Sequence, residues 1–259
     1  MNKTALITGA TSGIGYELAY VHAIHGGNLV LVARSKDKLE QLMLNLENKY
    51  FINVYIIEKD LSLKDSAKDV YDELIKNNIT IDYLINNAGF GDFGFLVNND
   101  WAKLEQMINL NITALTHLTK LFVPYMIKKG SGKIMNVAST AAFQPGPTMA
   151  VYYATKAYVL SFSEAISNEV KNKGITVTTL CPGPTKSGFQ EAASMNESRL
   201  VKGRILATSK QVAEYGYNAM LKGKSVVIPG ILNNLLANSV RFFPRSAVLK
   251  IARFIQDKR

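Results

Sequence analysis

The 259-residue chain has few of the residues that build disulfide frameworks or metal sites. It contains one cysteine, Cys181, so no intramolecular disulfide can form, which fits a reducing compartment. Its three histidines show no metal-ligand spacing, so we expect no metal site. No apolar run reaches about 18 residues, so we expect no membrane-spanning helix. No signal peptide fits before the apolar run that begins at Lys3, and we therefore expect a cytoplasmic protein.

Acidic residues are also scarce relative to basic ones. The chain has 30 Lys and Arg against 20 Asp and Glu, a net charge of +10 and a pI near 9.5. Such a charge can attract nucleic acid, an anionic membrane or acidic ligands. The lysines are scattered and not interleaved with aromatic residues, so we expect no binding to nucleic acid.

Short apolar runs alternate with segments of helical periodicity along most of the chain. The expected strands are Thr4–Thr8, Leu29–Ala33, Val54–Glu58, Tyr83–Asn86, Lys133–Val137, Thr176–Leu180 and Ser225–Ile228. The expected helices are Gly13–Gly26, Lys36–Lys49, Leu63–Asn77, Trp101–Lys129, Ala150–Lys173 and Ser209–Lys222. This order predicts an α/β fold, a single Rossmann-type doubly wound parallel sheet with helices on both faces, over residues 1–230.

Two segments depart from this alternation. Residues 188–207 form a long connection of small and polar residues, which predicts a lid. Residues 231–259 form a basic, amphipathic C-terminal extension of the same domain. We expect its apolar stripe to pack on the protein. The less favoured alternatives are that the extension binds a subunit partner, closes over the active site or contacts an anionic membrane. The stripe consists of Val248, Leu249, Ile251, Ala252 and Ile255.

Three glycines follow the first expected strand, where the chain turns into the first helix. The segment reads Thr8-Gly9-Ala10-Thr11-Ser12-Gly13-Ile14-Gly15. Glycines here let a pyrophosphate approach the helix N-terminus, whose N–H groups and dipole favour anions. At the first strand–helix junction of a parallel sheet, the motif predicts dinucleotide binding, and a tight turn without a ligand is the alternative.

The end of the second expected strand indicates which dinucleotide is bound. NAD-binding proteins usually carry an acid here for the ribose hydroxyls, whereas an arginine accommodates the 2′-phosphate of NADP. Ala33 stands at the acidic position and Arg34 follows it. We therefore predict NADP(H) in preference to NAD(H), with Arg34 as an ordinary surface charge as the alternative.

Tyr152 and Lys156 are four residues apart, so they share one face of the expected helix. A free tyrosine has a pKa of roughly 10, and a nearby cation lowers that pKa because it favours the phenolate. The pair could therefore act as a proton donor and acceptor near neutral pH. Tyr153 competes for this role, but Ala157, not a lysine, follows it at the same spacing. A solvated pair without function is the alternative.

Together these segments resemble the short-chain dehydrogenases/reductases, from Lys3 to about Ile228. Further matches are Asp60-Leu61 after the third strand, Asn86-Asn87-Ala88-Gly89 after the fourth, and Asn111. Ser139 lies thirteen residues before Tyr152, as in the family, and residues 182–187 resemble its Pro-Gly motif. The resemblance implies a dinucleotide site made by Gly9, Thr11, Ser12, Gly13, Ile14, Gly15, Arg34, Asp60, Leu61, Asn87, Ala88, Gly89, Tyr152, Lys156, Pro182, Gly183, Thr185 and Ser187.

The resemblance also implies catalytic roles for Asn111, Ser139, Tyr152 and Lys156. Tyr152 would protonate a carbonyl oxygen, and Ser139 would hydrogen-bond that oxygen. Lys156 would lower the pKa of Tyr152 and bind the nicotinamide ribose, while Asn111 would hold a water of a proton relay. We expect NADPH-dependent reduction of a ketone or aldehyde.

The substrate class is less specified than the chemistry. Aromatic and apolar residues near the expected site favour a hydrophobic carbonyl compound; they are Phe90, Phe93, Phe95, Phe143, Met149 and Phe189. A 3-oxoacyl-thioester reductase that meets an acidic carrier protein is an alternative, and a non-catalytic dinucleotide sensor is a weaker one. The resemblance further implies a homodimer or homotetramer, joined through the helices that carry Asn111 and Tyr152.

Overall fold

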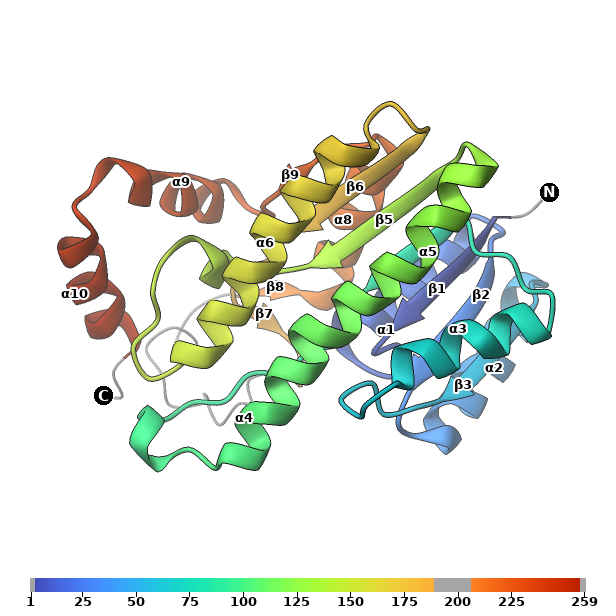
Figure 1. The fold of residues 1–259 in the computed structure, drawn as a ribbon, viewed down its shortest axis with the longest axis horizontal. Helices are drawn as coiled ribbons and strands as arrows, with labels where there is room; N and C mark the ends of the chain where they lie inside the picture. The colour runs from blue at the N-terminus through green and yellow to red at the C-terminus, as the bar shows by residue number, and fades with distance from the viewer. Residues whose placement is uncertain (1–2, 189–205, 257–259) are drawn as a thin grey trace.

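Seven parallel strands form the central sheet of the computed structural model, which describes residues 3–188 and 206–256 (Figure 1). Their order across the sheet is β3-β2-β1-β4-β5-β6-β9, and this confirms the predicted doubly wound α/β fold. The strands are β1 (Thr4–Thr8), β2 (Asn28–Ala33), β3 (Val54–Glu58), β4 (Tyr83–Asn86), β5 (Gly132–Val137), β6 (Ile175–Leu180) and β9 (Val226–Val227). The last is shorter than expected because only two of its residues pair with β6.

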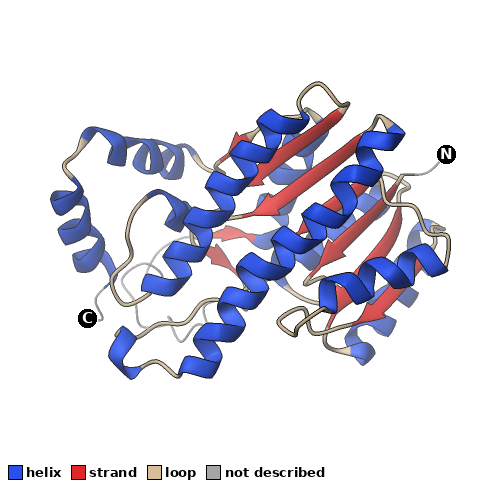
Figure 2. Ribbon diagram, in the orientation of Figure 1, coloured by secondary structure: helices blue, strands red, loops and turns tan. Residues whose placement is uncertain are grey.

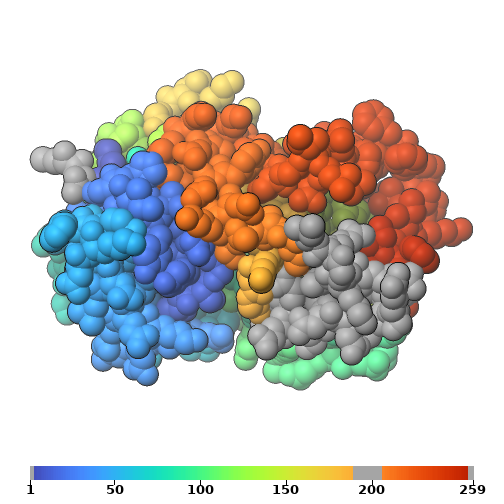
Figure 3. Space-filling model, turned by 180° about the vertical axis from the view of Figure 1, so that it is seen from behind, coloured from blue at the N-terminus to red at the C-terminus, as the bar shows by residue number. Residues whose placement is uncertain are grey.

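Helices cover both faces of this sheet (Figure 2). One face carries α1 (Gly13–Ile24), α2 (Lys36–Tyr50) and α8 (Ser209–Leu221), and the opposite face carries α3 (Ser66–Lys76), α5 (Leu115–Lys129) and α6 (Ala150–Val170). Seen from behind, α8 lies beside α1 (Figure 3). Side chains of a strand alternate between the two cores: Ala5 and Ile7 of β1 face α1 and α8, and Leu6 faces the other layer. Both sets are fully buried, which explains the continuous apolar strands.

The switch point of the sheet lies between β1 and β4, which are neighbours although two strands separate them in sequence. The connections that follow these two strands run to opposite faces of the sheet, so a crevice opens at the carboxyl ends of the strands. Thr8 at the end of β1 holds the two strands together, because its hydroxyl accepts hydrogen bonds from the backbone N–H groups of Asn87 (3.0 Å) and Ala88 (2.9 Å). The crevice is therefore fixed by β4 as well as by β1.

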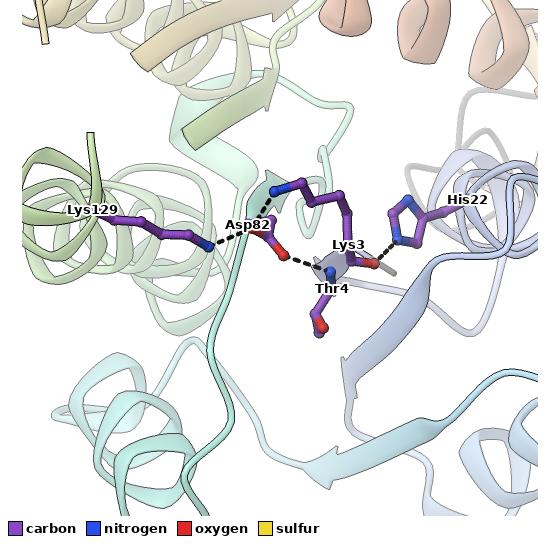
Figure 4. A network of polar contacts seen from close by, with 5 residues as sticks. All are labelled: Lys3, Thr4, His22, Asp82 and Lys129. Atoms are coloured by element: carbon purple, nitrogen blue, oxygen red, sulfur yellow. Dashed lines mark hydrogen bonds and ion pairs between the residues drawn. The ribbon is translucent and has the colours of Figure 1, made fainter. Parts of the chain in front are cut away.

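The amino end of the same two strands is stabilised by a buried carboxylate (Figure 4). Asp82, just before β4, accepts hydrogen bonds from the Thr4 backbone N–H (2.9 Å), Lys3 Nζ (3.2 Å) and Lys129 Nζ. Burial alone would raise the pKa of Asp82, but these hydrogen bonds outweigh it and lower the pKa below its usual value. Nearby, the buried His22 contacts the Lys3 carbonyl (3.0 Å) and the Tyr217 hydroxyl (2.8 Å), so its side chain has a structural role.

Two helices differ from their expected form. Helix α3 begins at Ser66 and not at Leu63, because Asp65 has a left-handed backbone (φ 61°) that cannot belong to an α-helix. Residues 101–129 follow one helical path, but it is divided into α4 (Trp101–Ile108), the π-helical η2 (Asn109–Ala114) and α5. A π-helical turn is a wider turn of the backbone, and such turns are frequent at functional sites. Asn111 lies within it.

Two features at the carboxyl end of the sheet were not predicted in detail. Strand β7 (Thr185–Lys186) pairs with β8 (Ala207–Thr208), so the two ends of the expected lid lie side by side. Most of that lid falls on residues 189–205, outside the described residues. Beyond β9 the chain forms α9 (Ile231–Ser239), the 3-10 turn η4 (Val240–Phe242) and α10 (Arg245–Gln256). No helix within residues 3–188 and 206–256 is long and apolar enough to cross a membrane.

Candidate active site

A cavity of about 910 Å³ lies at the carboxyl end of the sheet, over the switch point between β1 and β4. Nearly every residue predicted for the cofactor and the chemistry lines it. The exceptions are Gly15 and Asn111, which are buried directly behind the wall. Residues from segments far apart in the sequence thus meet in one space.

The glycine turn forms one end of this cavity. Gly9 has a positive φ of 66°, and a Cβ atom on it would lie 2.9 Å from the Cα of Ala88. A Cβ on Gly15 would lie 2.4 Å from both the Asn87 side-chain nitrogen and the Gly9 carbonyl oxygen. Asn87 uses this space, since its amide donates to the carbonyl oxygens of Thr8 (2.9 Å) and Gly9 (3.2 Å). The glycines therefore allow β4 to pack against the turn.

The N-terminus of α1 opens into the cavity without a side-chain cap. Ser12 is the N-cap residue, and its side chain makes no capping hydrogen bond. Backbone N–H groups in the first helical turn have no partner inside the helix, so they attract an anion together with the helix dipole. Gly13, with a φ of 57°, approaches Ser187 across this opening. A pyrophosphate fits this uncapped turn chemically.

Cationic side chains gather where β2 ends. Arg34 lies on the cavity wall with its Nη1 4.0 Å from Oδ2 of Asp60, and its side chain is 77% exposed. Lys38, in the first turn of α2, and Lys59 line the same region. The carboxylate of Asp60 also accepts from the Ser62 backbone N–H (2.9 Å) and hydroxyl (2.7 Å). This end of the cavity is consequently positive, with one carboxylate fixed by a turn.

Tyr152 and Ser139 stand together at the other end. Ser139 follows β5 and caps the 3-10 turn η3 (Thr140–Phe143), where its hydroxyl accepts from the Ala141 backbone N–H at 3.1 Å. Tyr152 lies in the first turn of α6 and forms a side-chain hydrogen bond with Ser139. Burial raises the pKa of the Tyr152 phenol well above its usual value, and the Ser139 hydrogen bond opposes part of that rise.

Lys156 lies one turn further along α6 and is almost fully buried. Its ammonium donates to the Val137 carbonyl oxygen at 2.9 Å and lies 5.8 Å from the centre of the Tyr152 ring. Burial lowers the pKa of Lys156 to about 8. Burial therefore raises the net pKa of Tyr152, and the expected pKa-lowering effect of Lys156 stays a prediction. Desolvation dominates both groups and disfavours the charged form of each.

Asn111 supports this pair from behind. Its side chain donates to the Thr155 hydroxyl (3.0 Å) and the Phe90 carbonyl (3.0 Å), and accepts from the Phe90 backbone N–H (3.1 Å). A Cβ on Gly89 would lie 2.9 Å from Oδ1 of Asn111 and 3.4 Å from Nζ of Lys156. Because glycine has no Cβ, Asn111 and Lys156 can both approach the backbone at this position. The π-helical turn thereby ties α6 to the loop after β4.

The tyrosine next to Tyr152 has a different setting. Tyr153 packs edge-on against Tyr152, with ring centres 6.0 Å apart, and Gly146 lies against its ring. It belongs to an apolar cluster with Met149 and the partly buried Phe90 and Phe93. Phe95 points outward and is half exposed, which differs from its expected place at the substrate. Phe189 lies outside the described residues.

A second apolar groove of about 630 Å³ begins on the far side of Tyr153. Tyr153 and Gln144 line both this groove and the main cavity. Phe143, expected at the substrate, lines the groove only. Val248 and Leu249 of α10 form its opposite wall.

Comparison with known proteins agrees with this geometry. The family model described as short chain dehydrogenase matches residues 3–198, well over half of the chain. The chain belongs to the short-chain dehydrogenase family. It is an NAD(P)-dependent oxidoreductase, as predicted from the sequence.

Two solved structures of this family are similar over most of the chain. A short-chain dehydrogenase from Sphingobium yanoikuyae in complex with NADPH is 30% identical, with a TM-score of 0.83, over 93% of this chain and 92% of that one. A bulky-bulky ketone specific alcohol dehydrogenase from Comamonas testosteroni is 29% identical, with a TM-score of 0.79 and the same coverage. The very-long-chain 3-oxoacyl-CoA reductase of Rattus norvegicus is 32% identical over 70% of this chain, which spans 59% of that protein.

Some residues of this short-chain dehydrogenase site were not predicted from the sequence. Lys38 lies near Arg34 at the start of the helix that follows β2, and this second cation so close to the strand end was an available signal. Asn233 of α9 had no such signal in the sequence. Its side chain packs on Gly183, where an added Cβ would lie 2.6 Å from the Asn233 amide nitrogen. That amide also donates to the carbonyl oxygen of Pro229. Cys181 is buried at the end of β6, and burial raises its pKa to about 12, which makes it an inert thiol.

Proposed function

We propose that this oxidoreductase reduces a hydrophobic ketone or aldehyde with NADPH, using Tyr152 as the general acid. The observation that carries the proposal is the hydrogen-bonded Ser139–Tyr152 pair on the cavity wall with Lys156 buried behind it. A bound nicotinamide would supply the hydride to the carbonyl carbon. As that bond forms, the electrons of the C=O double bond move to oxygen, where Tyr152 delivers its proton.

Each neighbouring group has a part in this proton transfer. The Ser139 hydroxyl would donate to the substrate oxygen and stabilise its developing charge. Lys156, protonated below about pH 8, would stabilise the phenolate that Tyr152 becomes after donating its proton. Asn111, in the π-helical turn, would hold a water through which that phenolate regains a proton from solvent. The apolar cluster around Phe90 and Met149 would receive the hydrophobic part of the substrate.

The adjacent tyrosines supply a matched test of the acid. We expect Tyr152→Phe to lower kcat by ~10² or more, the magnitude of a lost general acid, with little change in NADPH binding. Tyr153→Phe removes the same atom one residue away and is expected to keep turnover within about tenfold of the wild type. Measurement of kcat and of NADPH fluorescence titration for both variants decides between them. Loss of turnover in Tyr153→Phe with retention in Tyr152→Phe would overturn the assignment.

The preference for NADPH over NADH rests on the cations at the end of β2. Arg34 and Lys38 line the cavity, and the similar Sphingobium enzyme is described in complex with NADPH. Because a hydrogen bond to a charged group contributes about 1.5–3 kcal/mol, Arg34→Ala should lower kcat/KM for NADPH roughly tenfold or more. The value for NADH should stay within about twofold, because NADH has no 2′-phosphate for that hydrogen bond. Lys36→Ala is the control, since Lys36 pairs with Glu40 outside the cavity. A wild-type enzyme with a higher kcat/KM for NADH contradicts the proposal.

A second candidate substrate is a 3-oxoacyl thioester. The similarity to the very-long-chain 3-oxoacyl-CoA reductase and the apolar groove beyond Tyr153 both favour a long-chain carbonyl compound. A panel of ketones, aldehydes and 3-oxoacyl thioesters, assayed with NADPH, distinguishes the two candidates by kcat/KM. Activity on a carrier-linked thioester that falls as salt is added would favour an acidic carrier protein.

A non-catalytic sensor is disfavoured because it needs neither Tyr152 nor Ser139. One cysteine is consistent with the expected cytoplasmic location.

A further inference from the structure

The C-terminal segment exposes an unusual amount of apolar surface. On α9, Ile231, Leu232, Leu235 and Leu236 follow helical spacing along one side and are between 57% and 84% exposed. The opposite side of α9 is the one that packs on the protein, through the buried Ala237. Contiguous exposed apolar surface of this kind marks an interaction site more often than an accident of composition.

The next two elements continue this surface. Phe242 and Phe243, at the end of η4, are 86% and 57% exposed, and Ile251 and Phe254 of α10 are also exposed. Val248 and Ala252 of α10 are buried, as expected for a stripe that packs on the protein, but Leu249 and Ile251 of the same expected stripe are not. Helix α10 is therefore held by one side and presents apolar residues on the other. We call the exposed side chains of α9, η4 and α10 the tail surface.

The charge of this region has a single sign. No Asp or Glu occurs in the sequence between Glu214 and Asp257. The tail surface carries Arg241, Arg245, Lys250 and Arg253. Within residues 3–188 and 206–256, the first three of these have no carboxylate within ion-pair distance. Basic residues around an apolar face attract an anionic surface that can also accept apolar side chains.

Helices α9 and α10 lie beyond the carboxyl ends of the sheet strands (Figure 1), the same edge of the sheet at which the cavity lies. Arg253 of α10 lies over the ring of Phe95, 4.7 Å from its centre, so α10 contacts the loop that follows β4. That loop adds the exposed Phe95, Leu96 and Val97. The apolar groove beside Tyr153 reaches α10 at Val248 and Leu249, so an apolar path joins the tail surface to the cavity wall.

We propose that the tail surface docks on a lipid bilayer that carries anionic headgroups. The apolar side chains would enter the interface between headgroups and acyl chains, and the four cations would contact the headgroups. A second copy of the chain fits less well, because a two-fold contact would bring the cations of one tail surface against those of the other. The protein would bind at the membrane surface without crossing the bilayer. This docking is independent of the proposed reaction, and vesicle binding can be measured without any assay of enzyme activity.

Vesicle flotation tests the proposal with the full chain. We expect little binding to phosphatidylcholine vesicles and strong binding when phosphatidylglycerol is included, with binding reduced by added salt. Since a basic residue near an anionic surface contributes about 1 kcal/mol, Lys250→Gln should weaken binding to phosphatidylglycerol vesicles roughly fivefold. Phe242→Ser should weaken it roughly tenfold or more, because a buried aromatic side chain is lost from the interface.

Phe51→Ser is the matched control for Phe242→Ser. Phe51 is 91% exposed at the end of α2, on the part of the chain away from the tail surface, so its loss should leave binding within about twofold. All three variants should keep wild-type turnover of a water-soluble ketone, which shows that they are folded. Equal flotation with both vesicle types, or equal weakening by Phe51→Ser and Phe242→Ser, overturns the proposal. Absence of vesicle binding, with a dimer mass that Phe242→Ser reduces to that of one chain, assigns the surface to a second copy and also overturns it.

Discussion

At the residue scale, burial changes the ionisation of Lys156 in the candidate site. The side chain is buried and donates to the Val137 carbonyl, and this burial lowers its pKa to about 8. In the proposed reaction its positive charge stabilises the phenolate of Tyr152. The site thus loses its stabilising charge at a pH where an exposed lysine would still be fully protonated.

This gives a pH prediction with a definite sign. A lysine with a depressed pKa is charged below that pKa and neutral above it, so kcat/KM for NADPH in the reduction should fall as pH rises through about 8. The pH dependence of kcat/KM reports the pKa values of the free enzyme, and the structure describes the protein without bound cofactor or substrate. Lys156→Arg keeps the charge to a higher pH and should move the decline upward, although with a lower maximum. A wild-type profile that stays flat to about pH 10, the usual pKa range of lysine, contradicts the prediction.

The sequence predicted which residues meet at the candidate site, but not the ionisation of Tyr152 and Lys156. Helical spacing places Tyr152 and Lys156 on one face regardless of what covers that face. The sign of each pKa shift depends on burial, which β5, β6 and α6 create together. Spacing predicted a cation beside the phenol, but it did not predict the desolvation that raises the pKa of Tyr152. Only the packed fold contains that information.

At the element scale, β1, β4 and α5 are joined by Asp82 at the end of the sheet opposite the site. Its carboxylate is favoured by three hydrogen bonds, which lower its pKa in the folded protein. Stability from such a group is present above the unfolded pKa of about 3.9 and is lost as pH falls through the lower folded value.

We therefore expect Asp82→Asn to lower the free energy of unfolding at neutral pH by about 1–3 kcal/mol, since buried charge-assisted hydrogen bonds are lost. The deficit relative to the wild type should shrink as pH falls from about 3.9 toward the lower folded pKa, below which the wild-type carboxyl is also neutral in the folded protein. Urea unfolding across this pH range measures both. Asp72→Asn, which removes an exposed pair with Lys68, should cost less than about 0.5 kcal/mol. A deficit independent of pH would contradict the assignment of this stability to ionised Asp82.

The elements themselves were largely predictable because buried parallel strands are short, apolar and separated by helices. The π-helical turn at Asn109–Ala114 was not, since no residue type marks a change from i+4 to i+5 hydrogen bonding. Strands β7 and β8 were also missed, because two paired residues leave no periodicity to detect. The left-handed Asp65, which delays α3, can be recognised only from its backbone angles.

At the scale of the whole molecule, α5 and α6 present an outer face that we expect to join two subunits. Tyr158 is partly exposed there, stacks on Phe162 and contacts the Thr116 hydroxyl at 3.0 Å. We expect light scattering to give at least twice the 28.5 kDa of one chain, and Tyr158→Glu to lower that mass, because it buries a charge at the interface. Tyr215→Glu, on α8, is the control and should leave the dimer intact. A wild-type mass of one chain contradicts this expectation.

The pairing of β7 with β8 has a consequence for how this molecule can diversify. The chain leaves the catalytic framework after Lys186 and returns at Ala207, directly beside its point of departure. A segment whose two ends are fixed side by side can be replaced by a segment of another sequence and length. The cost is small, because doubling the length of a loop costs only about 0.6 kcal/mol in closure entropy. We therefore expect that grafting another sequence between these anchors would change the substrate preference and leave the Ser139–Tyr152 pair in place.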